Sequence, residues 1–248
     1  MIRALLLIIA ALLAGLDPAQ AQIRFGDHDP VDWHGRPPWN YPVHGIDVSR
    51  FQAEIDWRRV ARSGISFAFI KATEGGDLKD PMFDRNWQLA AREGLARGAY
   101  HFYYFCTAPE VQARWFMANV PRRGRALPPV LDLEWNPFSP TCTTRPPGPE
   151  VRRQVMIFMD LVERHYGQRP IIYTTPDFYR ETGIGALSEE FWLRSTAHTP
   201  DRVYPGQPWS FWQYTGTGIV PGVQGGVDIN VFVGSERQWR RWLRTRMR

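Results

Sequence analysis

Short apolar runs alternate with helical patterns from residue 43 onward. The apolar runs predict strands at residues 43–48, 67–72, 98–104, 129–133, 171–174, 191–195, 210–214 and 227–231. The helical spacing of apolar positions predicts helices at residues 55–62, 84–93, 109–119, 150–166 and 235–246. This alternation is typical of α/β proteins with a parallel sheet, and eight candidate strands favour a TIM-like barrel over a doubly wound fold. The last three strands lack convincing helices between them, so we expect an irregular barrel.

The N-terminal segment has the pattern of a secretory signal peptide. Arg3 precedes an apolar run at residues 4–16, and Ala19-Gln20-Ala21 follows as a small-x-small cleavage signal. We therefore predict a signal peptide at residues 1–21 and export to the periplasm or the extracellular medium. Residues 22–42 are rich in Pro, Trp, Asp and Gly, which predicts an extended N-terminal arm. Residues 43–248 are predicted to form one barrel domain that ends in a basic helix.

Charge and composition narrow the classes of partner. The formal net charge is +5, which would draw an exported protein to anionic wall polymers or membrane surfaces. We find no nucleic-acid-binding motif, so nucleic acid is not an expected partner. The chain holds 11 Trp, 9 Tyr and 14 Phe, and aromatic faces suit a sugar-binding cleft, although most should lie in the core. Nothing in the sequence demands more than a monomer.

The chain contains two cysteines, Cys106 and Cys142, and each follows a predicted strand by a few residues. They could therefore lie at the same end of the sheet and form a disulfide, as exported proteins often do. Two unpaired thiols remain the alternative at this stage.

Acidic residues close several of the predicted strands. In α/β barrels the chemistry lies at the carboxyl ends of the strands, and Asp47, Glu74, Asp132, Glu134 and Asp228 all lie there. Asp132 and Glu134 are two positions apart, so they point to the same side, with Cα atoms roughly 6.5 Å apart. Burial of such a pair raises the pKa of one member, and glycosidic cleavage needs one protonated acid beside one carboxylate. Pairing with an arginine or capping a helix is the alternative role for either acid.

Other common hydrolytic chemistries lack their motifs. There is no His-Glu-x-x-His motif or Cys/His cluster for zinc, no Gly-x-Ser-x-Gly elbow, and no glycine-rich phosphate loop. We therefore expect neither a metal nor a cofactor.

Nine short segments, in order and spacing, resemble the glycoside hydrolase family 25 lysozymes, also called Chalaropsis-type muramidases. These segments are residues 44–49, 55–57, 69–75, 84–86, 98–102, 131–134, 171–174, 212–214 and 227–230. The resemblance covers about residues 43–234. It implies five β/α units followed by three strands with few helices. It also implies hydrolysis of the β-1,4 bond between N-acetylmuramic acid and N-acetylglucosamine, so the expected partner is the glycan strand of peptidoglycan.

Carried over position by position, the resemblance implies that Glu134 is the general acid and Asp132 its acidic partner. Asp47 and Asp228 would complete the acidic floor of the site. Substrate contacts are expected from Glu74, Tyr100, His101, Tyr173, Trp212 and Gln213. Two mechanisms stay open: the acetamido group of the substrate attacks with help from Asp132, or water attacks directly with inversion.

The chain departs from the family pattern at two places. Arg194 stands where a small residue is expected, and an insertion at residues 137–149 follows the strand that carries the acidic pair. Either feature could narrow the cleft or alter its sugar contacts. Two alternative functions therefore remain open: a glycan-binding module that has lost catalysis, and a hydrolase of a related glycan such as chitin.

Overall fold

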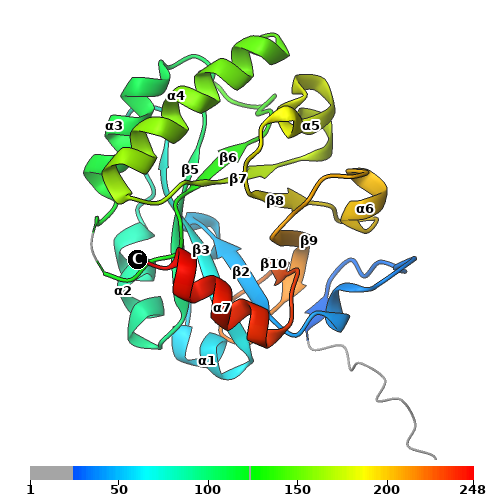
Figure 1. The fold of residues 1–248 in the computed structure, drawn as a ribbon. Helices are drawn as coiled ribbons and strands as arrows, with labels where there is room; N and C mark the ends of the chain where they lie inside the picture. The colour runs from blue at the N-terminus through cyan, green and yellow to red at the C-terminus, as the bar shows by residue number, and fades with distance from the viewer. Residues whose placement is uncertain (1–24, 123) are drawn as a thin grey trace, which may run out of the picture.

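The computed structural model describes residues 25–122 and 124–248, and within these ranges eight strands close into a barrel (Figure 1). The strands are β2 (His44–Val48), β3 (Ile65–Glu74), β5 (Ala96–Phe102), β6 (Val130–Leu133), β7 (Ile171–Thr174), β8 (Phe191–Arg194), β9 (Phe211–Ile219) and β10 (Val227–Phe232). Neighbouring strands are parallel from β2 round to β9, and β10 runs antiparallel between β9 and β2. The predicted irregular barrel is confirmed. The predicted signal peptide at residues 1–21 lies outside the described residues.

One helix follows each of the first five barrel strands. These helices are α1 (Trp57–Arg62), α2 (Phe83–Arg92), α3 (Pro109–Asn119), α4 (Gly148–Tyr166) and α5 (Pro176–Thr182). Only the four-residue α6 (Pro200–Val203) lies between the last three strands of the described chain, so five β/α units are followed by three strands, as expected. In the described part of the chain, none of the helices combines the length and apolar character that a membrane span requires.

Aromatic rings fill the barrel below its open end. Phe69 stacks on Trp192 with ring centroids 4.6 Å apart, and Phe67 packs edge-on against Phe211 at 5.1 Å. Gly45 makes room for this layer, because a Cβ atom at that position would lie 2.3 Å from the Phe67 ring. The barrel is therefore solid here, as in other eight-stranded α/β barrels, and a ligand can enter only from one end.

The C-terminal helix α7 (Glu236–Arg246) covers the other end of the barrel. Ser235 and Gln238 form a capping box at its start, and Trp239 packs against Phe67 and Phe232 at 5.4 and 5.2 Å. Phe67 stands near the start of β3, so α7 lies at the amino-terminal end of the parallel strands. This helix lies within the range expected for it, residues 235–246, and its basic face is exposed. Its exposed arginines are Arg237, Arg240, Arg241 and Arg244.

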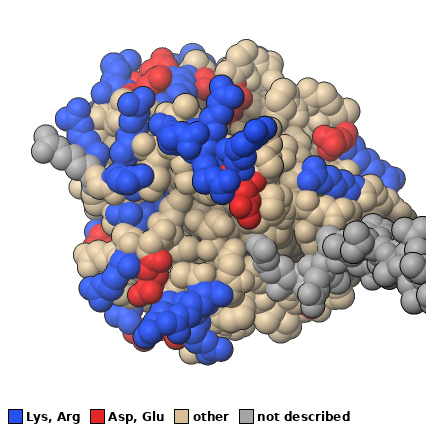
Figure 2. Space-filling model, turned by 60° about the horizontal axis from the view of Figure 1, so that its bottom comes forward, with Lys and Arg blue, Asp and Glu red and all other residues tan. Residues whose placement is uncertain are grey.

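The side of the molecule shown in Figure 2 is rich in basic side chains. Lys and Arg gather there in several clusters, with few Asp and Glu among them. Exposed arginines include Arg58, Arg59 and Arg62 of helix α1 as well as those of α7. This distribution of charge is relevant to binding of anionic polymers.

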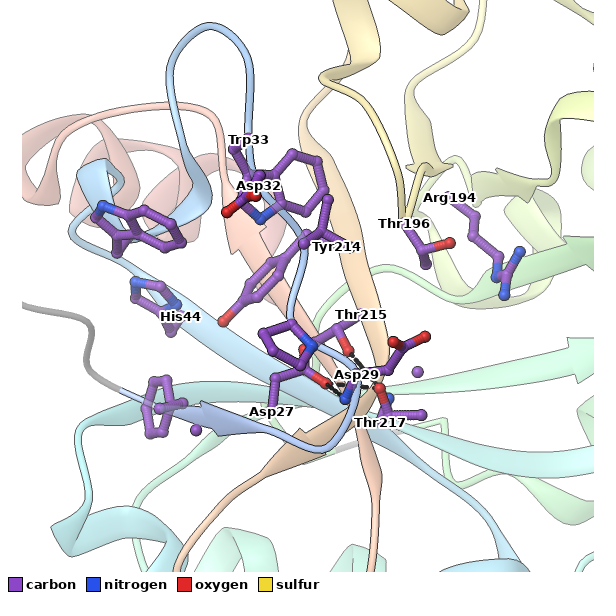
Figure 3. A pocket seen from close by; sticks show the side chains of 16 residues that line it. Asp27, Asp29, Asp32, Trp33, His44, Arg194, Thr196, Tyr214, Thr215 and Thr217 are labelled. Atoms are coloured by element: carbon purple, nitrogen blue, oxygen red, sulfur yellow. Dashed lines mark hydrogen bonds between the residues drawn. The ribbon is translucent and has the colours of Figure 1, made fainter.

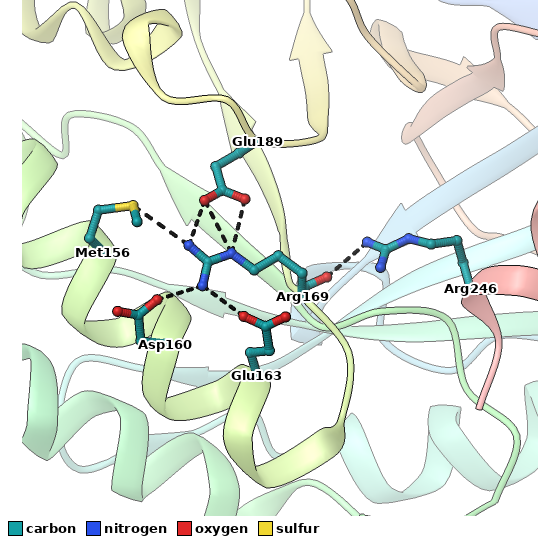
Figure 4. A network of polar contacts seen from close by, with 6 residues as sticks. All are labelled: Met156, Asp160, Glu163, Arg169, Glu189 and Arg246. Carbon is teal, nitrogen blue, oxygen red and sulfur yellow. Dashed lines mark hydrogen bonds and ion pairs between the residues drawn. The ribbon is translucent and has the colours of Figure 1, made fainter.

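A half-buried arginine joins three elements behind the barrel. Arg169, in the turn before β7, binds Asp160 and Glu163 of α4 and also Glu189 before β8 (Figure 4). Arg246 of α7 donates a hydrogen bond to the carbonyl of Arg169 at 2.8 Å. These charged contacts hold α4, β8 and α7 in a fixed arrangement. They lie away from the open end of the barrel and serve the fold.

The described part of the arm, residues 25–42, packs against the barrel. Its strand β1 (Gly26–Asp27) pairs antiparallel with the far end of β9, and η1 (Pro38–Asn40) forms a single 3-10 turn. Tyr41 contacts Trp212 and Trp209, with ring centroids 6.0 and 5.8 Å apart. The arm is therefore part of the folded domain and not only a leader to it.

Cys106 and Cys142 form a disulfide across 36 positions of sequence, which decides between the two alternatives for the thiols. The bond ties the 137–149 insertion to the segment between β5 and α3. Since β6 leads directly into the insertion, the disulfide restrains the chain just beyond the acidic pair.

Candidate active site

A cavity of about 470 Å³ opens at the carboxyl ends of the barrel strands. Most of the polar residues predicted for the site line it: Asp47, Tyr100, Asp132, Glu134, Tyr173, Gln213 and Asp228. They come from six different strands or strand ends, and only closure of the barrel brings them together. Asp228 and Asp47 stand directly opposite each other in the β10–β2 ladder, and Asp132 stands beside Tyr173 in the β6–β7 ladder.

Asp47 is held by a chain of buried hydrogen bonds. Its Oδ2 accepts from Gln213 Nε2 at 3.0 Å and from Asn230 Nδ2 at 2.8 Å. Tyr173 donates to Gln213 Oε1 at 2.9 Å, and Trp192 donates to Asn230 Oδ1 at 2.7 Å, so both amides are fixed in orientation. Burial raises the pKa of Asp47 to about 6, and the two amide hydrogen bonds oppose that rise. The network favours the charged form of a carboxylate that burial alone would protonate.

The acidic pair at the end of β6 is strongly shifted. Burial raises the pKa of Glu134 to about 7, while the positive charges of Arg194 and Lys71 act in the opposite direction. Burial also raises the pKa of Asp132 well above its usual range, and the neighbouring Glu134 charge adds to the rise. Two carboxyl groups this close and this buried do not both ionise at neutral pH. The site can therefore hold a proton on this pair under conditions where exposed acids are charged.

Asp132 has one atom without a partner among the described residues. Its Oδ1 is buried, and no hydrogen-bond donor of the described chain reaches it. A buried polar atom usually has a partner, so an exception in a cavity deserves a functional explanation. A ligand N–H or O–H group would satisfy this oxygen.

Two cations balance the acids. Arg194, at the end of β8, lowers the pKa values of Asp47, Glu134 and Asp228, although burial still raises all three. Lys71 of β3 lines the cavity and donates to Glu74 Oε2 at 2.6 Å. The site therefore holds its acids in a mixed field and not in a purely negative one.

Glu74 stands behind this cavity and not among its lining residues. Burial would raise its pKa, but the Lys71 ammonium and a hydrogen bond from Tyr104 lower it below the usual value. Glu74 therefore orients Lys71 and does not itself line the cavity.

His101 and Trp212, two predicted substrate contacts, are fully buried and face away from the cavity, so those two predictions are wrong. His101 stacks on Phe158 of α4, with ring centroids 5.1 Å apart. Trp212 donates from Nε1 to the carbonyl of Ser195. Successive side chains of a strand point to opposite faces, so His101 cannot share a face with Tyr100, nor Trp212 with Gln213.

Lys71 and Asn230 were not among the residues predicted for the site. Alternation could have found both, because Lys71 is two positions after Phe69 and Asn230 is two positions after Asp228. Arg194 was noted only as a departure from the family pattern, and it lines the cavity. Among the residues that the structure describes, no group of three or more His, Cys, Asp or Glu is placed to hold a metal ion.

Comparison with known proteins gives a consistent result. The model of the glycosyl hydrolases family 25 matches residues 46–223. The chain is 41% identical over 206 residues to the uncharacterized protein YegX of Escherichia coli O157:H7, an alignment that covers 81% of this chain and 73% of that protein. It is 39% identical over 207 residues to Lysozyme M1 of Streptomyces globisporus, covering 78% of this chain and 68% of the other. A family 25 glycosyl hydrolase from Bacillus anthracis superposes with a TM-score of 0.76 at 34% identity, covering 84% of this chain and 95% of that one.

Proposed function

The chain belongs to the glycosyl hydrolases family 25, and from that premise we propose that it cleaves the β-1,4 bond between N-acetylmuramic acid and N-acetylglucosamine in peptidoglycan. The observation that carries the proposal is the buried Asp132/Glu134 pair at the mouth of the barrel, where Glu134 keeps a proton up to about pH 7. Relatives named as lysozymes and muramidases support peptidoglycan as the substrate.

In this proposal Glu134 is the general acid. Departure of the leaving sugar requires a proton on the glycosidic oxygen, and a carboxylic acid that is protonated near neutral pH can supply it. Glu134 meets that condition because it is desolvated, and Arg194 keeps its pKa from rising further. Asp132 is too deeply buried to serve equally well as the first proton donor.

Asp132 positions the substrate. Its partnerless Oδ1 would accept the N–H of the acetamido group on the sugar that undergoes cleavage. That hydrogen bond would turn the acetamido oxygen toward the anomeric carbon, where it replaces a protein carboxylate as the nucleophile. Of the two mechanisms that the sequence leaves open, we propose this substrate-assisted one.

Asp47 and Asp228 form the floor of the site below the reacting sugar. A glycosidic transition state develops positive charge on the ring, and fixed carboxylates stabilise it without reorganisation. The amide hydrogen bonds to Asp47 keep one such carboxylate in place. Tyr100 and Tyr173 line the same cavity and would contact the ring of the sugar.

The test is digestion of purified peptidoglycan, with identification of the new reducing ends by mass spectrometry. We expect muramic acid ends from the wild type and none from Glu134→Gln. Glu110→Gln, an exposed acid on α3, is the matched control and should digest like the wild type.

Each other outcome of this test supports a different function. New N-acetylglucosamine reducing ends in digested wall would contradict muramidase activity and support a hydrolase of a related glycan. Turnover of a chitin oligomer without turnover of wall would support the same conclusion. A folded protein that pellets with wall but produces no ends would favour a glycan-binding module. Wild-type activity in folded Glu134→Gln would remove Glu134 from the mechanism.

We also propose that the protein acts after export, since its substrate lies outside the cytoplasm and residues 1–21 have the pattern of a signal peptide. N-terminal sequencing of protein recovered from periplasm or medium should begin at Gln22. Recovery from the cytoplasm of a chain that still carries residues 1–21 would contradict this.

A further inference from the structure

A second cavity, of about 600 Å³, lies beside the first. One wall is the N-terminal arm, with Asp29, Asp32 and Trp33, and the other is the middle of β9, with Tyr214 and Thr215 (Figure 3). Arg194 lines both cavities. The two cavities are therefore neighbours that meet at the Arg194 side chain, although their β9 residues Tyr214 and Gln213 point to opposite faces of the strand.

The walls of this cavity combine ring faces with polar groups. Trp33, Trp39 and Tyr214 line it, and each is only partly buried. Figure 3 places Tyr214 near the centre, with Trp33 and Asp32 along one edge and Thr196 on the side of Arg194. Apolar ring faces beside carboxylates and hydroxyls suit a sugar, which offers C–H faces and hydroxyl groups together. The volume lies within the range of about 300–1,000 Å³ usual for ligand pockets.

The arm that forms the cavity is fixed in place. Thr217 donates to Asp27 Oδ1 at 2.6 Å, and His28 N donates to the carbonyl of Thr217 at 3.0 Å. Trp33 packs edge-on against the buried Trp212, with ring centroids 5.0 Å apart. The wall is therefore preformed, so binding of a ligand does not carry the entropic cost of ordering it.

This wall is an addition to the family domain. The family match begins at residue 46, and the arm residues of the cavity all lie before it. The cavity therefore combines a surface of the family barrel with a segment outside the match.

We propose that this second cavity binds a further N-acetylhexosamine unit of the same glycan strand whose reacting bond lies at Glu134. The inference rests on the proposed function, because it assigns the occupant from the Arg194 side chain that lines both cavities. The lining holds the acids Asp27, Asp29 and Asp32 and the single arginine Arg194, so a neutral sugar fits better than an anionic peptide side branch. The arm would thus make this enzyme prefer longer strands.

The test uses alternating N-acetylglucosamine and N-acetylmuramic acid strands of two, four, six and eight sugars. Calorimetry with the Glu134→Gln protein measures Kd without turnover, and kcat/KM is measured separately with the wild type. We expect the affinity to rise with the length of the glycan strand. Between two successive lengths it should rise in one step of about tenfold, when the strand becomes long enough to reach the second cavity. Trp33→Ala should remove that step in both assays.

Two further variants guard against misfolding as the explanation. Asp32→Ala changes an exposed side chain and leaves the packing of Trp33 on Trp212 in place, so it should reduce the same step. Trp115→Ala is the matched control, because Trp115 is half-buried on α3 and belongs to neither cavity. It should keep the full step.

The outcomes separate this inference from the proposed function. Turnover with no length step, or a step that survives both Trp33→Ala and Asp32→Ala, overturns the subsite and leaves the muramidase standing. A Trp33-dependent binding step without turnover by the wild type overturns the muramidase and supports the glycan subsite.

Discussion

Neighbouring side chains give the carboxyl groups of the site different properties. Asp47 accepts two amide hydrogen bonds, and its pKa of about 6 lies below the value of about 7 at Glu134. Between these values Asp47 is ionised while Glu134 still holds its proton. That is the combination that an acid-catalysed glycosidic cleavage requires.

We therefore expect a bell-shaped dependence of kcat/KM on pH, with apparent pKa values near 6 and 7. Activity should fall below pH 6 as Asp47 gains a proton, and above pH 7 as Glu134 loses its proton. Arg194→Gln should move both limbs to higher pH, because Arg194 lowers both pKa values. Initial rates on a soluble glycan from pH 4 to 9 measure this; limbs that do not move would contradict the assignment.

The raised pKa of Glu134 also affects stability. Its folded pKa lies above the ordinary value, so between about 4.5 and 7 the native state holds a proton that the unfolded state has lost. Stability from this group is complete below that window and falls as pH rises through it. Glu134→Gln should raise Tm relative to wild type at pH 8 and match it at pH 4. Differential scanning calorimetry tests this, with Glu110→Gln expected to show no such pH-dependent gain.

The partnerless Asp132 oxygen makes a stereochemical prediction. Attack by the acetamido group and then by water gives two inversions, so the first product should keep the β configuration. Proton NMR during the first minutes of digestion distinguishes the anomers. An α product would establish direct attack by water and assign Asp132 to that water.

At the residue scale, most acidic residues of the site could be predicted from the sequence, but not which of the aromatic and histidine residues line it. Acids at the carboxyl ends of strands can be recognised in a sequence, because a barrel brings these ends together at one open end. Asp132 and Glu134 also share a side through their spacing. Alternation means that only one of Tyr100 and His101 can face the cavity. Which of them does so depends on the register of β5, and the apolar pattern alone does not determine that register.

At the scale of elements, the disulfide restrains the insertion that follows β6. Replacing Cys106 and Cys142 by alanine should cost about 4 kcal/mol of unfolding free energy, because the closed loop spans 36 positions. Urea denaturation measures the loss, and wild type kept reduced should behave like the double variant. Equal stability of oxidised and reduced wild type would contradict this prediction.

Elements with a clear apolar period could be predicted, and those defined by tertiary pairing could not. All eight barrel strands were predicted, but β9 continues to Ile219 through a Thr-Gly-Thr-Gly sequence that resembles a turn. Pairing with β1 and β10 holds those glycines in a strand. Helix α5 was not predicted because it spans only seven residues; Pro176 begins it and Gly183, with a φ of 61°, ends it.

At the scale of the whole molecule, the acidic site and the exposed arginines of α7 lie at opposite ends of the barrel. The acids line the mouth, beside Lys71 and Arg194, and α7 covers the closed end. We propose that the basic side contacts anionic wall polymers, which would leave the mouth free to take a glycan strand.

This arrangement predicts salt-dependent retention on wall. Pelleting of Glu134→Gln with wall that carries anionic polymers should decrease as salt rises from about 50 to 300 mM, because screening weakens surface charges. Arg240→Glu combined with Arg244→Glu should weaken pelleting at low salt. Arg114→Glu combined with Arg164→Glu, at exposed positions on α3 and α4, changes the net charge by the same amount and is the control. Equal loss in both would assign the effect to overall charge.

Closure of the barrel by β10 has a consequence for biosynthesis. Asp228 and the Asn230 partner of Asp47 lie on β10, which pairs with β2, the first strand of the barrel. A ribosome that has released the chain only as far as β9 has made a chain with neither group and with an open barrel. Products that stop before β10 would therefore be inert, and cutting of the wall becomes available only after β10 has been made.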